Sequence, residues 1–427
     1  MQPDKVTETV GIVIASVFIT GLLLEFILTR LLKKNYFSSE FLIINLSIAS
    51  LQQLTDVLNK LLFISAFVFV QQHYSIQRLF GWNEVAVTNP FAGYHIHFFV
   101  LLNYLFVLIL ADFCQYWLHR FSHEVNIMWA GHITHHSNTE YNFGVALRQN
   151  ALENIYTWVF FMPLAFFGIP WQMFIAAYAV SLIWQFLVHT RLVNKLGVLE
   201  YFMSTPSHHR VHHGKNPQYI DKNYGAFFIV WDKLFGTFEP EVDEVDYGIL
   251  KPLQNQNPVW SNVHHHIHIV KTAASAGKWS DKLKVVFGRP AFVPEGIMEN
   301  PVSSAVPNFT RQPEKKLYVF INFILVSALS FITINHFEQT GDVANMALAM
   351  IATVACFSIF TALLENKRWA DYTEVGRLIL IAVIGLGVSF QNQLTLFGVI
   401  SFSVAILLLL ATWFIARRYK MSMNTVQ

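Results

Sequence analysis

Cysteine and charge are both scarce in this sequence. Only two cysteines occur among 427 residues, Cys114 and Cys356, and both lie in apolar runs. A disulfide framework or a zinc site built on cysteine thiolates is therefore excluded. Charged residues make up 13% of the chain and the formal net charge is +2, with no basic patch interleaved with aromatic residues. We therefore expect no nucleic-acid partner.

Apolar residues are abundant instead. They make up 54% of the chain, 39 residues are phenylalanine, and the mean hydropathy is +0.41. Most of this apolar content falls in blocks of about 20 residues, the length that crosses a bilayer as a helix. The composition predicts an all-α, polytopic helical bundle whose main surroundings are the membrane bilayer.

The apolar blocks give an expected helix count. The block Tyr156–Val188 is interrupted near Gly168 and Pro170 and is expected to form a helical hairpin. Val10–Leu28 is long for a signal sequence and lacks a clear cleavage site, so it is expected to be a retained membrane helix. With the other blocks, the sequence predicts about nine crossings. Those other blocks are Phe41–Val70, Phe98–Leu118, Leu317–Ile334, Met346–Leu364, Leu378–Phe390 and Leu394–Ile415.

The distribution of Lys and Arg predicts the orientation, since these residues accumulate on cytoplasmic flanks. Placing Arg30, Lys33 and Lys34 in the cytoplasm also places the basic residues of 311–316, 367–377 and 417–420 there. Residues 119–154 and 189–316 then face the cytoplasm. The protein is expected in the endoplasmic reticulum of a eukaryote or the inner membrane of a bacterium.

Three histidine clusters lie in these cytoplasmic stretches: HRFSH, HITHH and HRVHH. Residues three and four positions apart share one face of a helix, so each cluster can turn two or three imidazoles toward one point. A single interfacial histidine is usually structural, but ionisable groups repeated at this spacing beside a bilayer are costly unless they pair or bind metal. The clusters contain His119 and His123, then His132, His135 and His136, then His209, His212 and His213.

His189 lies at the end of the expected hairpin, on the same side of the membrane, and is added as a ninth ligand. Nine imidazoles are too many for one metal ion, so the sequence predicts a two-metal centre in a cytoplasmic cap. Imidazole suits iron, zinc or copper.

Two carboxylates are candidates for supporting roles. Asp112 lies two helical turns before His119 inside an apolar span, and is expected to orient a ligand histidine by accepting a hydrogen bond. Glu124 follows His123 directly. It is expected to accept from a histidine, bind metal or transfer a proton, although an interfacial glutamate at a helix end is equally ordinary.

The strings around these residues resemble the fatty acid hydroxylase and sterol desaturase superfamily and, within it, the alkylglycerol monooxygenase family. They read WLHRFSHEVNIMWAGH from Trp117, ALRQ from Ala146, TPSHHRVHHG from Thr205, DKNY from Asp221 and IVWDKLFGTF from Ile229. The resemblance is strongest from about Asp112 to Gly248. It implies a hydroxylase-like catalytic core, placed over 98–250. The apolar blocks and the polar stretch after it predict N-terminal membrane helices over 1–97, a loop-rich cap segment over 251–316 and C-terminal membrane helices over 317–427.

The resemblance implies that the eight cluster histidines bind two iron ions and that Glu124 supports activity. It further implies dioxygen as co-substrate, tetrahydrobiopterin as electron source, and an alkylglycerol or ether lysolipid hydroxylated at the carbon next to the ether oxygen. A fatty aldehyde and a glycerol derivative result. An electron-donor protein or a pterin-recycling enzyme is a possible partner.

Two other functions stay open at this point. One is a sterol or fatty-acyl hydroxylase or desaturase with the same metal centre. The other is a metal transporter or sensor, although transporters usually hold ionisable ligands near the bilayer midplane, whereas these clusters flank the helices on one side.

Overall fold

The structure is a computed structural model that describes residues 5–80, 98–297, 307, 309–391 and 407. In these ranges the regular elements are helices, accompanied by two isolated bridges, Met203 with Phe228 and Gly214 with Tyr247. The expected all-α class is confirmed for this part of the chain.

Long helices form the body of the molecule. Within the described ranges, four segments are long and apolar enough to cross a membrane: Thr9–Leu31, Leu101–Glu124, Pro313–Phe337 and Val343–Leu364. This supports a multi-pass membrane protein, while nine crossings are not shown. The expected span Leu394–Ile415 lies outside the described residues apart from position 407. The long helices are α1 (Lys5–Leu31), α2 (Ser39–Tyr74), α4 (Phe98–Glu124), α14 (Pro313–Thr340), α15 (Val343–Leu364) and α16 (Ala370–Gln391).

The expected hairpin over Tyr156–Val188 forms with shorter helices. Its first arm consists of α7 (Asn154–Thr157), η1 (Trp158–Phe161) and α8 (Met162–Phe166), and its second arm is α9 (Trp171–Leu187). Gly168 breaks the chain between them with a φ of 76°, which is costly for a residue with a Cβ. The Gln77 side chain occupies the space that a Cβ at position 168 would need, and its amide donates to the Phe167 carbonyl oxygen at 2.8 Å.

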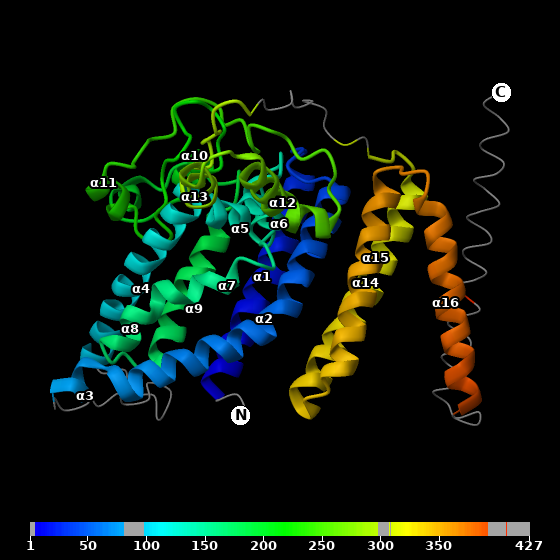
Figure 1. Cartoon of the computed structure of the whole chain (residues 1–427), viewed down its shortest axis with the longest axis horizontal. Coiled ribbons are helices and arrows are strands. Elements are labelled where there is room, and N and C mark those ends of the chain that lie inside the picture. The colour runs from blue at the N-terminus through cyan, green and yellow to red at the C-terminus, as the bar shows by residue number, and fades with distance from the viewer. Residues whose placement is uncertain (1–4, 81–97, 298–306, 308, 392–406, 408–427) are drawn as a thin grey trace.

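A cap covers one end of this body (Figure 1). Its main helices are α5 (Asn126–His136), α10 (Pro206–His212), α11 (Val230–Phe235), α12 (Pro258–Ser275) and α13 (Trp279–Phe287). The short elements α3 (Ile76–Phe80), α6 (Phe143–Ala146) and η2 (Gly197–Tyr201) complete the described fold. Helices α4 and α9 both end at the cap, so their last residues enter it.

Two apolar clusters hold the body together. In one, Phe67 of α2 packs with Val107 and Ala111 of α4 and with Phe174 of α9. In the other, the first half of α2 packs against α14, α15 and the start of α16 through buried residues such as Ile44. Because α2 contributes to both clusters, it joins the histidine-bearing helices to the C-terminal helices.

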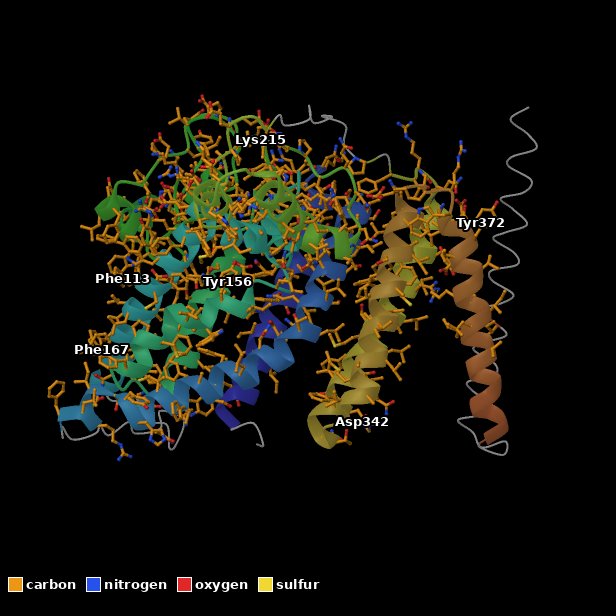
Figure 2. All side chains as sticks on the ribbon, viewed as in Figure 1. Phe113, Tyr156, Phe167, Lys215, Asp342 and Tyr372 are labelled. Atoms are coloured by element: carbon orange, nitrogen blue, oxygen red, sulfur yellow. The ribbon has the colours of Figure 1, made fainter. Side chains whose placement is uncertain are left out.

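The turn between α14 and α15 lies at the end opposite the cap, as Figure 2 shows for Asp342 and the cap residue Lys215. We predict that cysteines introduced singly at these two positions, with Cys114 and Cys356 replaced by Ala, react from opposite sides of a sealed membrane. An impermeant maleimide added to vesicles of one orientation should label only one of the two, and both after permeabilisation. Equal labelling of both in sealed vesicles would contradict this arrangement.

Candidate metal centre

Nine histidines from four segments meet in the cap. The last turns of α4 carry two, α5 carries three, and α10 with the residue that follows it carries three more. His189 follows α9. All nine are between 3 and 8% exposed, so none is a solvated surface histidine. Burial lowers the pKa of His189 to about 4 and that of His212 to about 3, which keeps both imidazoles neutral at pH 7.

The nine imidazoles form two groups, within each of which one ring nitrogen of every histidine lies within 4.8 Å of the others. Group one has five members and group two has four. The two groups are neighbours, since the rings of His136 and His213 stack across them with centroids 4.3 Å apart. Group one is His119, His123, His132, His136 and His212; group two is His135, His189, His209 and His213.

The division between the groups follows the helical angle between neighbouring residues. Residues i, i+3 and i+4 were expected to share one helix face and point at one centre. In the structure the i, i+4 pairs stay together, His132 with His136 and His209 with His213, while the intervening His135 and His212 join the other group. Adjacent helix residues diverge by about 100°, so neighbours such as His135 and His136 cannot point at the same centre.

Backbone and carboxylate oxygens set the tautomer of several rings. His119 Nδ1 lies 2.8 Å from the Tyr224 carbonyl oxygen, and His132 Nδ1 lies 3.0 Å from Glu153 Oε1. These oxygens only accept hydrogen bonds, so the proton of each ring is on Nδ1 and Nε2 carries a lone pair. The Nδ1 atoms of His135, His189 and His212 similarly face the carbonyl oxygens of Arg148, Gln185 and Lys222 at 3.3, 2.6 and 2.9 Å.

The Nε2 atoms then face one another. His119 Nε2 lies 3.1 Å from His132 Nε2 in group one, and His135 Nε2 lies 3.2 Å from His189 Nε2 in group two. His135 Nδ1 has a second partner, the Gln149 side-chain amide nitrogen at 3.2 Å, so its tautomer is not fixed by the Arg148 carbonyl alone. For His119 and His132 both protons are on Nδ1, so no N–H···N hydrogen bond can form between the two rings, and their buried lone pairs repel. A cation between them turns this repulsion into coordination.

The donor set fits two transition-metal ions. With a metal–nitrogen distance of about 2.1 Å, adjacent ligands lie about 3.0 Å apart at right angles and about 3.4 Å apart in a tetrahedron. The Nε2 separations between His132 and His136, His136 and His212, and His189 and His209 are 3.2, 3.1 and 3.0 Å. In addition, the Nε2 atoms of His123 and His213 are buried with no hydrogen-bond partner, which costs about 1–3 kcal/mol each unless a ligand is bound. Neutral imidazole is a ligand for iron, zinc or copper.

One loop supplies two of the orienting carbonyls and is held by two aspartates. Asp232 accepts from the backbone N–H groups of Tyr224 and Gly225, both at 2.7 Å. Asp112 accepts from the backbone N–H groups of Phe227 and Phe228 at 2.8 and 3.0 Å, and also from the Trp231 indole. Among the described contacts, Asp112 therefore accepts three hydrogen bonds from this loop and none from an imidazole. Its expected role in orienting a ligand histidine stays a prediction.

Glu124 lies outside both groups. Its Oε1 accepts from Arg120 Nε at 3.1 Å and lies 3.9 Å from an Arg289 guanidinium nitrogen, and its side chain is 21% exposed. This places Glu124 at the cap surface beside His123. A direct role as metal ligand finds no support in this position, whereas a role in proton transfer stays a prediction.

Sequence reasoning missed Glu153, whose carboxylate accepts from a ring nitrogen of His132. No regular spacing connects the two residues, which are brought together because the chain returns under α5. Arg148 is also fully buried, and its guanidinium donates to Asn45, Thr134, Ser137 and Gln256. Arg148 thereby connects α2 with α5 and with the segment that precedes α12. Its own carbonyl oxygen faces His135 Nδ1.

The other histidines of the cap lie outside the two groups. His265 of α12 contacts the Asn126 side-chain oxygen at 2.7 Å. His208 points away from its neighbour His209 and contacts the Thr205 backbone N–H in a capping box at the start of α10.

Comparison with known proteins identifies relatives of the chain. The fatty acid hydroxylase family model matches residues 104–237, which include all nine histidines. A human protein named alkylglycerol monooxygenase is 33% identical over 383 residues, covering 86% of this chain and 80% of its own length. A Xenopus tropicalis protein of the same name is 46% identical over 184 residues, 43% of this chain and 41% of that protein. The ornithine lipid hydroxylase of Rhizobium tropici is 32% identical over 195 residues, 42% of this chain and 57% of that protein. No solved structure matches.

We predict that His136→Ala and His213→Ala each remove one metal ion, so that the purified protein falls from about two metal ions per chain to about one. Plasma emission spectrometry on detergent-purified protein measures this. His265→Ala is the matched control, since it removes a partly buried cap histidine outside both groups and should leave the metal content unchanged. Full metal content in both ligand variants would refute the two-group arrangement.

We predict that Glu153→Ala lowers the metal affinity of group one by about 10–100-fold, because His132 loses the carboxylate that orients its ring. Glu153→Gln keeps an accepting oxygen and should retain more affinity. Competition with a chelator measures both. Glu244→Ala, which removes a carboxylate 91% exposed, is the control. Wild-type affinity in Glu153→Ala would show that Glu153 does not position a ligand.

Proposed function

The chain belongs to the alkylglycerol monooxygenase family of fatty acid hydroxylases, and from this premise we propose that it hydroxylates glyceryl ethers with two histidine-bound iron ions. The single observation that carries the proposal is the pair of buried histidine groups, in each of which one ring nitrogen of every member lies within 4.8 Å of the others. The proposed substrate is an alkylglycerol, as the name of the human relative indicates, or an ether lysolipid of the same linkage.

The proposed reaction inserts one oxygen atom of dioxygen into the C–H bond next to the ether oxygen. Two electrons and two protons reduce the other atom to water, and tetrahydrobiopterin is the proposed two-electron donor. The hydroxylated product is a hemiacetal, whose C–O bond breaks to give a fatty aldehyde and a free glycerol hydroxyl. Iron, when bound, supplies the binding and reduction of dioxygen.

The protein residues provide position and exclusion of water. The nine ligands are the histidines of group one and group two, held in their tautomers by Glu153 and by backbone carbonyls. Asp112 is proposed as a positioning residue. It accepts hydrogen bonds from the Phe227 and Phe228 backbone and so fixes the loop whose Tyr224 carbonyl oxygen faces His119. Glu124 is proposed to support proton transfer at the cap surface, where Arg120 and Arg289 lie beside it.

The location of the groups favours an enzyme over a transporter. Both groups lie at the cap end of the helices, beyond the middle of the candidate membrane spans (Figure 1). Transporters bind their ions near the bilayer midplane. We propose that this cap is cytoplasmic, in the endoplasmic reticulum or a bacterial inner membrane, where a pterin-recycling enzyme or an electron-donor protein has access to it.

The test incubates membranes containing the protein with a long-chain alkylglycerol, dioxygen and reduced tetrahydrobiopterin. We expect fatty aldehyde to form, and a His136→Ala variant to lose at least about 100-fold of this activity, because a metal ligand is removed. Mass spectrometry of the trapped aldehyde is the readout. Turnover of a sterol or an acyl lipid, with no aldehyde from an ether by fully metal-loaded protein, would instead support the related hydroxylase or desaturase function.

A further inference from the structure

An apolar groove opens between α1 and the end of α9. Its volume is about 370 Å³, which is within the range of ligand pockets. Leu24 and Leu28 of α1, Leu187 of α9, and Leu192 and Leu196 of the following loop contribute to its wall. Because α1 carries one of the candidate membrane spans, the groove lies beside lipid.

A buried carboxylate interrupts this apolar wall. Glu25 is 1% exposed, and it accepts hydrogen bonds from the Thr190 hydroxyl and from the Phe143 backbone N–H. A carboxylate can accept about four hydrogen bonds, so these two partners leave capacity for others. An ionisable residue within a membrane span is costly and usually has a functional reason.

The groove also borders the metal-binding segments. Val188 and Thr190, the two neighbours of His189, both line it, as does Pro206, the first residue of the helix that carries His209. His189 and His209 belong to group two, and their Nε2 atoms are 3.0 Å apart. The apolar wall, the carboxylate and the group-two backbone are thus contiguous.

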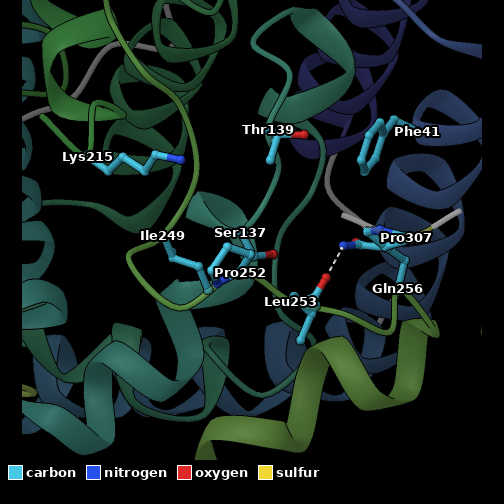
Figure 3. A pocket seen from close by; sticks show the side chains of 9 residues that line it. All are labelled: Phe41, Ser137, Thr139, Lys215, Ile249, Pro252, Leu253, Gln256 and Pro307. Atoms are coloured by element: carbon cyan, nitrogen blue, oxygen red, sulfur yellow. Dashed lines mark hydrogen bonds between the residues drawn. The ribbon is translucent and has the colours of Figure 1, made fainter. Parts of the chain in front are cut away.

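A second cavity in the cap lacks these properties (Figure 3). It lies among Phe41, Ser137, Lys215 and Gln256 and measures about 10 Å³, roughly the space of one water molecule. An alkyl chain cannot enter it. The groove beside α1, by contrast, has a volume and an apolar lining that suit a lipid chain.

We propose that this groove binds the alkyl chain of the ether substrate, and that Glu25 accepts a hydrogen bond from a hydroxyl of its glycerol group. This inference rests on the proposed function and adds the binding site to it. In an alkylglycerol the reacting methylene lies between an apolar chain and a hydroxyl-bearing head group. A site for it needs an apolar channel, a hydrogen-bond acceptor and metal ligands side by side, which are the three features that meet around Thr190.

The first test locates the chain directly. An alkylglycerol with a diazirine on its alkyl chain is irradiated with the purified protein, and labelled peptides are identified by mass spectrometry. We expect labels in residues 21–28 and 187–196, competed by unlabelled alkylglycerol. Competed labels confined to α14 or α15 would overturn the inference. The readout needs no turnover, so it is independent of metal loading.

The second test narrows the groove. Leu24→Trp places a bulky ring in its wall, whereas Leu23→Trp makes the same change at the adjacent residue, which does not line it; the two leucines are 54% and 56% exposed. We expect Leu24→Trp to raise the KM for a long-chain alkylglycerol about tenfold with metal content unchanged, and Leu23→Trp to leave it near wild type. Equal KM values in the two variants would contradict the proposal.

The third test concerns Glu25. One substrate analogue is an alkylglycerol whose glycerol hydroxyl nearest the ether oxygen is methylated, so that it cannot donate a hydrogen bond to Glu25. Wild-type protein should discriminate against this analogue by at least about tenfold in kcat/KM. Glu25→Gln should reduce this discrimination, while Leu24→Trp should retain it. Undiminished discrimination in Glu25→Gln would remove Glu25 from the site. If wild-type, metal-loaded protein forms no aldehyde from any ether, the proposed function itself fails, whatever the labelling shows.

Discussion

The mutual repulsion of buried imidazole lone pairs is the constraint on which the rest of this structure depends. Nine histidines with little solvent exposure gather in two groups, and several of their Nε2 atoms lie 3.0–3.2 Å apart. For His119 and His132 both protons are fixed on the far side of the ring, so no hydrogen bond can relieve the contact. Binding a cation in each group converts an unfavourable cluster into the most stable part of the cap.

The surrounding elements can be understood as the means of holding these rings in place. The histidines of α4 and the one after α9 lie where these helices end at the cap. The other histidines lie on α5 and on α10 with the residue that follows it, within the cap. Asp112 and Asp232 fix the loop whose carbonyl oxygens face His119 and His212. The fully buried Arg148 joins α2 to α5 and to the segment that precedes α12. Helix α9 and the first residue of α10 also contribute to the wall of the groove beside α1, so the proposed substrate site borders the segments that carry the group-two histidines.

Much of this arrangement could be predicted from the sequence because it depends on local periodicity. Apolar blocks indicated the helices. The histidine spacing indicated eight of the nine residues that gather, and the end of the expected hairpin indicated His189. What the sequence argument missed depends on contacts between distant segments. Glu153 reaches His132 only through the tertiary fold, and Asp112 meets a loop more than a hundred residues later. The number of membrane crossings is also hard to read from the sequence, since α2 continues from Ser39 to Tyr74 through the polar residue Asp56 and is not among the candidate membrane spans.

The division into groups of five and four histidines could have been anticipated from the helical angle between adjacent residues, which separates His135 from His136 and His212 from His213. X-ray absorption at the iron edge of purified, iron-loaded protein tests this arrangement most directly. The account predicts two irons per chain, a first shell of nitrogen and oxygen near 2.1 Å, and the outer-shell scattering of four to five imidazoles per iron on average. A single bound iron, or one surrounded by only one or two imidazoles, would contradict it.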